Sequence, residues 1–215
     1  MDDVVRAWVD GWVVSRGAAP PRVEPWGYTI DVGQPDHVSR HVLRAMDEEL
    51  DEVTVRKVAE PVTGAGVWLK LFAEPARVGP WLGDGWSFEP EPSFLMSAAL
   101  ADEPAPPVPD GYRLRTWHRG GVIRALLTAP DGSMAARGQI APTGATAVAD
   151  QIETAAAHRR KGFGRLVMQA LAQEAVAQGA EIGVLAATPA GRTLYESLGW
   201  RIEAPLTSAK CTRRR

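Results

Sequence analysis

The most informative stretch of the sequence is His158-Arg159-Arg160-Lys161-Gly162-Phe163-Gly164-Arg165. A strand-like segment, 146–154, precedes it, and a segment with apolar residues at helical spacing, 162–178, follows it. The glycines let backbone N–H groups approach a ligand closely, and a helix start adds unpaired N–H groups and partial positive charge. Together with three consecutive basic residues, this junction predicts a cradle for a phosphate or pyrophosphate group.

The segments around this junction form a regular series. Four strands joined by turns predict an antiparallel meander, and the strand, helix and strand that end the series predict a parallel crossover. The expected strands are 112–117, 122–127, 134–140 and 146–154, followed by a helix at 162–178, a strand at 182–186, a helix at 190–198 and a last strand from Trp200 onward.

The half of the chain before this series is mixed in character. We expect helices at 4–14 and 36–46 and strands at 28–32, 53–58, 67–72 and 93–98. A proline-rich run, 103–109, is stiff and supports neither a helix nor a central strand, so it predicts a domain boundary. The expected division is an N-terminal α/β region (1–103), a linker (104–110) and a second domain (111–215).

Other phosphate-binding patterns fit the junction less well. The chain contains no Gly-x-x-x-x-Gly-Lys-Ser/Thr sequence, which excludes a P-loop. A dinucleotide fingerprint is matched only in part, because Val167 stands where the third glycine belongs. Taken alone, a basic glycine-rich turn is also compatible with a solvated loop.

Two motifs resemble the GNAT superfamily of acyl-CoA-dependent N-acetyltransferases. The pattern Arg159-x-x-Gly162-x-Gly164 is similar to that family's pyrophosphate motif, Gln/Arg-x-x-Gly-x-Gly/Ala. The segment Gly191-Arg192-Thr193-Leu194-Tyr195-Glu196-Ser197-Leu198-Gly199-Trp200 is similar to its second motif, a Leu-Tyr pair before a Gly-aromatic turn. The resemblance covers roughly 145–205. It implies an α/β (α+β) fold with a mixed, mostly antiparallel sheet and flanking helices, preceded here by a smaller mixed α/β region.

The resemblance also implies an activity. We expect an acyltransferase that moves an acetyl group from acetyl-CoA, as co-substrate, directly to the primary amine of a small molecule or peptide. A non-catalytic acyl-CoA-binding sensor or partner domain is the alternative. The residues implied to bind acetyl-CoA are Ile152, Thr154, Ala155, Ala156, Arg159, Arg160, Lys161, Gly162, Phe163, Gly164, Arg165, Thr188, Arg192 and Tyr195.

The sequence departs from the family pattern in two places. The family has two helices between its first and second strands, and residues 117–122 leave no room for them. We expect residues 1–103 to supply that wall of the amine site or to form a degenerate second copy of the fold. Thr188 replaces a common asparagine, which weakens one expected cofactor contact.

Three residues are candidates for catalysis. The amine must lose a proton before it attacks the thioester, and Asp150 or Glu153 could accept it. Three residues apart on a strand, the two should point to opposite faces, with Asp150 the first choice; either one could equally be a solvated carboxylate. Tyr195 matches the family's tyrosine acid, and a phenol with a pKa of about 10 can protonate a thiolate at modest cost. A bulge at Ile152–Ala156 is implied to free backbone donors for the oxyanion.

Composition and residue spacing bear on the remaining hypotheses about partners, location and metal binding. The net charge is −2, so no nucleic-acid or membrane partner is expected, although the Arg159–Lys161 patch keeps nucleic-acid binding open as a rival. Cys211 is the only cysteine, and the acidic start resembles no secretory signal, so we expect a cytoplasmic protein. His37 and His41 have helical zinc-site spacing, but Arg40 lies between them, so no metal is expected. A homodimer is left open.

Overall fold

The structure, a computed structural model, describes residues 3–101 and 106–213. Its chain forms two compact units, and each unit draws on residues from both sides of the proline-rich segment. The first comprises Met1–Arg16, Ser97–Leu185 and Leu194–Arg201, and the second comprises Gly17–Met96, Ala186–Thr193 and Ile202–Arg215. Residues 102–105 of the expected boundary lie outside the described residues, so the division into 1–103, 104–110 and 111–215 stays a prediction.

The first unit contains the predicted meander and crossover. Strands β7 (Arg113–Arg119), β8 (Val122–Thr128), β9 (Met134–Thr143) and β10 (Thr146–Thr154) pair antiparallel in sequence order. Strand β11 (Ile182–Ala187) pairs parallel with β10. The β7–β8 turn is a two-residue loop, Gly120-Gly121, in which both residues have positive φ (60° and 75°), as a tight hairpin turn requires. The expected absence of two helices between these strands is confirmed.

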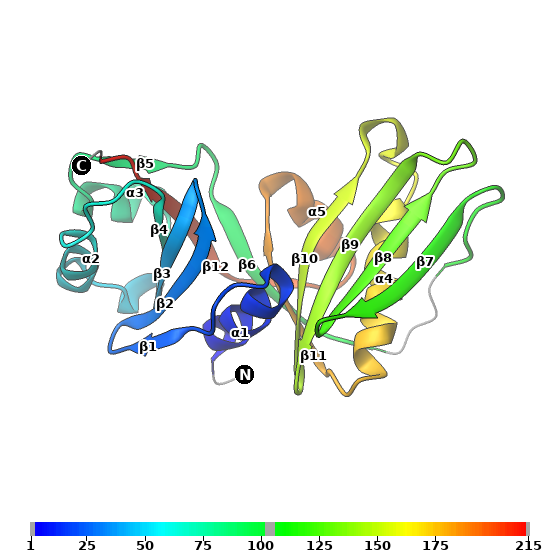
Figure 1. The fold of residues 1–215 in the computed structure, drawn as a ribbon, viewed down its shortest axis with the longest axis horizontal. Coiled ribbons are helices and arrows are strands. Elements are labelled where there is room, and N and C mark those ends of the chain that lie inside the picture. Colours follow the sequence, from blue (N-terminus) through cyan, green and yellow to red (C-terminus); the bar gives the residue numbers. More distant parts are fainter. Residues whose placement is uncertain (1–2, 102–105, 214–215) are drawn as a thin grey trace. The chain divides into compact units, whose positions relative to one another are not determined.

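One helix packs on each face of this sheet (Figure 1). Helix α4 (Phe163–Val176), which follows the short turn η3 (Ala156–His158), packs on β8, β9 and β10 through the predicted apolar stripe. Helix α1 (Val4–Arg16) packs on β9 and β10 from the other side. This approach is close, because a Cβ atom at Gly11 would overlap the side chain of Val148.

In the second unit, the strands do not pair in simple sequence order. Strands β1 (Arg22–Glu24), β2 (Gly27–Gln34), β3 (His37–Met46), β4 (Val67–Phe72) and β12 (Arg201–Cys211) follow one another, and β5 (Trp86–Phe88) also pairs with β12. Helices α2 (Glu52–Ala59) and α3 (Pro75–Val78) and the turns η1 (Asp47–Glu49) and η2 (Gly79–Trp81) complete it. Its core joins Leu43, Leu50, Val55, Leu69 and Leu71.

Four elements carry the chain from one unit into the other. They are β6 (Ser93–Ala99), β11, α5 (Pro189–Ser197) and β12, and each has residues in both units. Their expected types, three strands and one helix, are confirmed. The mixed, mostly antiparallel pairing with flanking helices confirms the predicted fold class.

Two predictions in the N-terminal half are wrong. Residues 36–46 form strand β3 rather than a helix, because Pro35-Asp36 makes a two-residue hairpin turn and β3 is paired on both sides, by β2 and β4. Val38 is 47% exposed, so the helix-like spacing of its apolar residues does not mark a buried face.

Residues 53–58 form helix α2 rather than a strand. The Asp51 carboxylate caps this helix by accepting hydrogen bonds from the Thr54 amide (2.9 Å) and hydroxyl (2.8 Å). Val55 and Val58 are buried, but Val53 is 76% exposed, which is the pattern of a helix with one buried face. The cap and the buried face outweigh the strand preference of the valines.

Candidate active site

The middle of β10 is interrupted by a bulge. Asp150 pairs with Gln139 of β9, and the next pair is Glu153 with Arg137, so two residues of β10 stand opposite one residue of β9. Gln151, inside the bulge, has a φ of 55°, which is uncommon for a residue with a side chain. The bulge expected near Ile152–Ala156 therefore begins slightly earlier, at Gln151.

The bulge changes the direction of the side chains that follow it. Gln139 and Arg137 are two residues apart on β9, so their partners Asp150 and Glu153 point to the same face of the sheet, the face on which α1 packs. The prediction that the two carboxylates point to opposite faces is wrong. It assumed an unbroken strand, in which residues three apart point to opposite faces, whereas the extra residue in the bulge brings Glu153 back to the face of Asp150. Ile152 points to the other face, towards Val167 and Leu171 of α4.

Strands β10 and β11 part just before the bulge. Their parallel pairing covers three residue pairs, from Thr146 and Ile182 to Val148 and Val184, although both strands continue further. The side of β10 that faces β11 is therefore unpaired from residue 149 onward among the described residues. Such a separation exposes main-chain donors and acceptors between two strands of a sheet.

The loop after β10 is shaped by two residues with left-handed backbone. Arg160 has a φ of 63° and Gly162, the N-cap of α4, has a φ of 79°. The side chains of Arg160, Lys161 and Arg165 are exposed, whereas the Arg159 Nε donates to the Thr154 carbonyl oxygen (3.4 Å) and closes the loop on β10. The loop thus carries basic side chains at the start of a helix.

The start of α4 has free donors. The first intrahelical bond runs from the Leu166 N–H to the Gly162 carbonyl oxygen (3.0 Å). Within the described part of the chain, the N–H groups of Phe163, Gly164 and Arg165 have no acceptor, and no side chain caps the helix. These three N–H groups and the helix dipole form a site suited to an anion.

Gly164 is required for close packing at this point. A Cβ atom there would lie 2.9 Å from Leu194 Cδ2 and 3.5 Å from Thr154 Oγ1. Gly162 differs, because a Cβ atom there would meet nothing within 4 Å and only its positive φ favours glycine. The two glycines of the motif therefore have separate physical roles.

An aromatic cluster supports the loop and was not predicted from the sequence. The Tyr112 ring lies 4.7 Å from that of Phe163, and its hydroxyl is 3.3 Å from His158 Nδ1. Tyr112 precedes β7 and is 51 positions from Phe163 (163 − 112), so no local pattern could join them. Phe163 is buried in this cluster, and its side chain is a support for the loop.

Asp150 is held by several donors. Its carboxylate accepts hydrogen bonds from the Ser15 hydroxyl (2.8 Å), from Nε and Nη2 of Arg16 and from the Gln151 amide (2.9 Å). Its side chain is 14% exposed. Gln139 extends the cluster by donating to the Ser15 carbonyl oxygen (2.8 Å) and hydroxyl (2.7 Å). Asp150 thus fastens the end of α1 to β10.

Glu153 is in a more open position. Its Oε2 pairs with Arg137 Nε (2.9 Å), and both side chains are about half exposed (49% and 51%). No donor reaches its Oε1 among the residues that the structure describes. Of the two predicted carboxylates, Glu153 therefore has the more accessible lone pairs.

Tyr195 lies on α5 and is 8% exposed. Burial, with a further contribution from the charge of Asp150, raises the pKa of Tyr195 to about 12. The phenol is therefore neutral at any physiological pH. Its hydroxyl forms no hydrogen bond with a described residue, and its ring packs 6.0 Å from that of Trp200.

Two other predicted residues belong to the second unit. Thr188 precedes α5, and its hydroxyl accepts a hydrogen bond from the Gly191 amide (3.2 Å). The Arg192 guanidinium lies over the Phe94 ring at 4.9 Å. Ala155 and Ala156, also predicted, lie in the loop after β10, where the Ala155 amide donates to the Ala135 carbonyl oxygen (3.0 Å).

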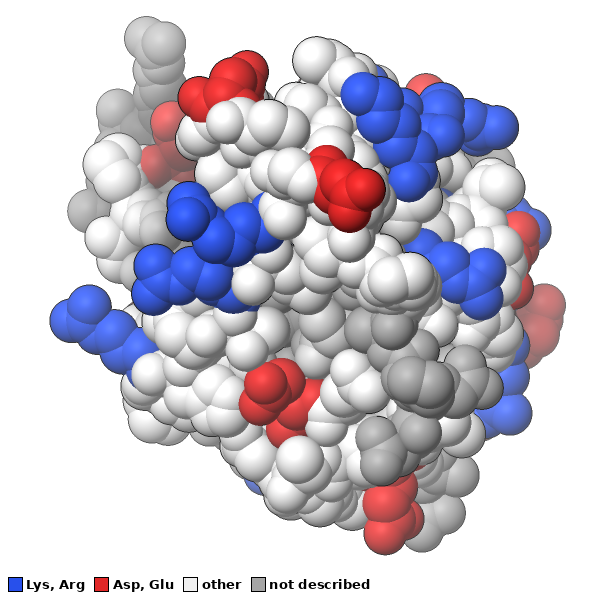
Figure 2. All heavy atoms as spheres, turned by 90° about the vertical axis from the view of Figure 1, so that its right-hand side faces the viewer, with Lys and Arg blue, Asp and Glu red and all other residues white. Residues whose placement is uncertain are grey.

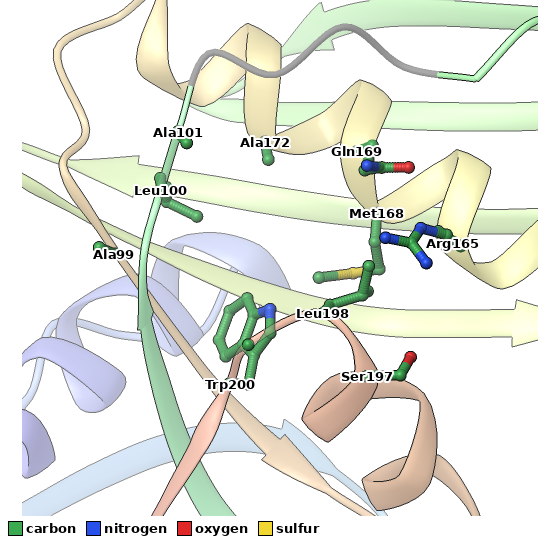
Figure 3. Close-up of a pocket in the computed structure, with 11 residues that line it drawn as sticks. Ala99, Leu100, Ala101, Arg165, Met168, Gln169, Ala172, Ser197, Leu198 and Trp200 are labelled. Carbon is green, nitrogen blue, oxygen red and sulfur yellow. The ribbon is translucent and has the colours of Figure 1, made fainter.

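A cavity of about 290 Å³ lies beside α4 (Figure 3). Met168 and Gln169 of α4, Leu198 and Trp200 line it, and Arg165 stands at the end nearest the start of the helix. The Gln169 Oε1 is buried without a hydrogen-bond donor from the described residues. A ligand hydroxyl or amino group in the cavity could supply that donor.

The other candidates lie elsewhere. His37 and His41 lie on β3, and His41 Nδ1 is 3.0 Å from the Thr29 hydroxyl. Burial lowers the pKa of His41. Cys211 is fully buried. Over residues 3–101 and 106–213, no three His, Cys, Asp or Glu side chains are grouped so that they could hold a metal ion.

A helix that crosses a bilayer must be long and apolar. None of the helices in the described ranges combines the length and apolar character that crossing a bilayer requires.

Comparisons with known proteins found one family model and several similar solved structures. Residues 121–207 match the family model described as FR47-like protein. A GCN5-related N-acetyltransferase from Kribbella flavida shares 16% identity with a TM-score of 0.66 over 97% of this chain and 95% of its own. A protein from Novosphingobium aromaticivorans assigned to GNAT family acetyltransferases shares 18% identity with a TM-score of 0.57 over 100% and 98%.

A GCN5-related N-acetyltransferase-like protein from Streptococcus suis gives 13% identity and a TM-score of 0.55 over 93% of this chain and 91% of its own. No curated protein matches the sequence. Identities this low establish the fold alone. The chain thus has the fold of these N-acetyltransferase structures, and its residues 121–207 match the FR47-like model.

Proposed function

We propose that the protein is an N-acetyltransferase that moves the acetyl group of acetyl-CoA directly to a primary amine. The observation that carries the proposal is the coincidence of two features on consecutive elements. The free N–H groups at the start of α4 suit a pyrophosphate, and the separation of β10 from β11 directly before it suits an extended acyl-pantetheine chain.

The residues present fit acetyl-CoA. Arg160, Lys161 and Arg165 supply positive charge around the free N–H groups. Gly164 lets the start of α4 pack closely against Leu194 and Thr154, and the unpaired Gln169 Oε1 offers an acceptor in the cavity beside α4. Acetyl-CoA brings the thioester, whose carbonyl carbon is the electrophile. In the reaction the amine nitrogen bonds to that carbon and the carbon–sulfur bond breaks.

We assign the removal of the amine proton to Glu153, directly or through a water molecule. The reason is the difference in hydrogen bonding between the two carboxylates. Asp150 accepts from four donors, whereas Glu153 accepts from one and is about half exposed. Asp150 then acts as a positioning residue that holds α1 against β10. This reverses the order of preference drawn from the sequence.

Tyr195 is assigned to the leaving thiolate. With its pKa at about 12, complete proton transfer to a thiolate of pKa about 8.5 would be uphill by roughly 5 kcal/mol. We therefore assign it a hydrogen bond to the departing sulfur, with solvent supplying the final proton. Main-chain N–H groups at the bulge would stabilise the oxyanion, which makes the identities of those side chains unimportant.

Calorimetry with acetyl-CoA tests the proposal. Wild-type protein should bind with a micromolar Kd, and Gly164→Trp, which fills the space beside Leu194 and Thr154, should abolish binding. Gly83→Trp is the matched control, because an added Cβ there meets nothing. A screen of amines with detection of the free CoA thiol then tests transfer. Binding without transfer to any amine would support the non-catalytic alternative, and a folded protein that binds no acyl-CoA would refute the proposal.

A further inference from the structure

The face of the β7–β10 sheet opposite α4 is only partly covered. Strand pairing aligns Trp117, Arg124, Gln139 and Asp150 in one row across this face. Helix α1 ends at that row, where Ser15 binds the side chains of both Gln139 and Asp150. On the β7 side of these contacts, this face is formed by side chains of β7 and β8. No described helix packs on it there in the way that the apolar stripe of α4 packs on the opposite face.

The open part of this face is basic. Arg113, Arg115 and Arg119 are exposed on β7, two residues apart or at multiples of two, so all point to the same side. None of the three forms an ion pair with any residue in the described ranges. Arg124 of β8 joins them and donates to the Arg119 carbonyl oxygen (3.2 Å).

Carboxylates do little to balance this charge. On the same face of β10, Asp150 is already paired with Arg16, and Glu153 is paired with Arg137. Figure 2 looks onto the side where β7 is the edge strand in Figure 1, and it shows groups of Lys and Arg with separate carboxylates between them. The net charge of −2 is a property of the whole chain and does not describe this face.

An aromatic side chain interrupts the row of arginines. Trp117 is 40% exposed and stands between Arg115 and Arg119. Residues two apart on a strand are separated by about 7 Å, which is close to the distance between successive phosphates of an extended single strand. An exposed aromatic ring offers a stacking surface for any base, and flanking arginines neutralise phosphates. Open antiparallel sheets with exposed aromatic residues bind unpaired nucleotides in this way.

We propose that the face formed by Arg113, Arg115, Trp117, Arg119 and Arg124 binds single-stranded nucleic acid. Base stacking on Trp117 holds one nucleotide, and the arginines contact phosphates on either side. A duplex fits less well, because its bases are not free to stack on the ring. This inference departs from the expectation, drawn from net charge, that the protein has no nucleic-acid partner, and it does not depend on acetyl transfer.

Fluorescence anisotropy with labelled U12 and dT12 oligonucleotides tests the proposal. For wild type, the logarithm of the affinity should fall with the logarithm of the salt concentration with a slope of about −2.8, as expected for four phosphate contacts on a single strand. Arg113→Gln combined with Arg115→Gln should reduce that slope by about 1.4. Trp117→Ala should weaken binding about 10-fold, and Trp117→Phe should weaken it much less.

Three controls locate the site. Arg160→Gln with Lys161→Gln and an excess of acetyl-CoA should both leave oligonucleotide binding unchanged, because the proposed contacts are made by side chains of β7 and β8 and not by the loop before α4. Each variant should keep the wild-type circular dichroism spectrum. The salt dependence of wild-type binding requires no variant, so it tests the proposal even if a variant fails to fold.

Several results would overturn the proposal. One is the absence of salt-dependent binding by wild type. Competition by acetyl-CoA would move the site to the loop, and tighter binding to a 12-base-pair duplex would exclude stacking on Trp117. Equal binding to a poly-glutamate peptide would indicate an acidic protein partner instead.

Discussion

Asp150 and the start of α4 are two strongly polar regions of the same compact unit, and they use their hydrogen-bonding groups differently. Four donors around Asp150 are directed at its carboxylate, which fixes α1 on the sheet. The N–H groups of Phe163, Gly164 and Arg165 have no acceptor among the described residues, and solvent or a ligand must satisfy them. A polar cluster whose partners are all internal supports the fold, whereas unpaired donors at an open position are available for binding.

The largest expected effect is on the affinity for acetyl-CoA, and it distinguishes the loop before α4 from Asp150. Arg160→Glu with Lys161→Glu should raise the Kd for acetyl-CoA at least 100-fold, because two charged contacts of about 1.5 kcal/mol each are replaced by repulsion. Asp150→Asn should change the Kd less than threefold. The matched control is Arg115→Glu with Arg119→Glu, which changes the net charge equally on β7. Calorimetry that gave similar losses for both pairs would mean that long-range charge, and not the loop, governs affinity.

The second effect concerns chemistry rather than binding. Tyr195→Phe should lower kcat between 10-fold and 100-fold while the Kd for acetyl-CoA stays within threefold, because only the hydrogen bond to the departing sulfur is lost. Steady-state kinetics with the amine found in the screen provide the measurement. If kcat is unchanged, Tyr195 is a packing residue beside Trp200 and the leaving group takes its proton from solvent alone.

The region from β7 to α5 could be predicted because its patterns are local. The turn at Gly120-Gly121, the apolar stripe of α4 and the glycines before it each lie within one element or one junction. Residues 36–46 and 53–58 were mistaken because the deciding groups lie outside the apolar pattern: a two-residue turn at Pro35-Asp36 and a cap at Asp51. There, tertiary pairing and capping outweighed side-chain spacing.

In the candidate site too, local features could be predicted from the sequence and long-range contacts could not. The sequence predicts the donors at the start of α4, because a glycine-rich junction before a helix has few alternatives. It could not predict that Asp150 is occupied by Ser15 and Arg16, which are 135 and 134 positions away in the chain. The bulge at Gln151 was misplaced by about one residue, and that single residue decides on which face Glu153 lies.

The third prediction measures the structural role of Asp150. Asp150→Ala should lower the free energy of unfolding by about 2 kcal/mol, because it leaves a partly buried Arg16 and Ser15 without their acceptor. For a chain of this length the Tm should fall by about 4 to 8 °C. Glu153→Ala, which removes an exposed pair, should cost less than about 0.5 kcal/mol. Denaturant unfolding of both variants, with Arg16→Ala to complete a double-mutant cycle, checks the difference; equal losses would contradict the proposed anchor.

The smallest effect is a dependence of stability on pH. The folded-state pKa of Tyr195 is raised to about 12 from an ordinary value of 10.0, so the folded state holds this proton more tightly than the unfolded state. The stabilisation is fully present below pH 10 and is lost as the pH rises through 12. Between pH 9 and 11, wild type should therefore lose about 1 kcal/mol more stability than Tyr195→Phe. Urea unfolding at both pH values measures this; parallel losses in the two proteins would mean that the Tyr195 hydroxyl is hydrated in the folded state.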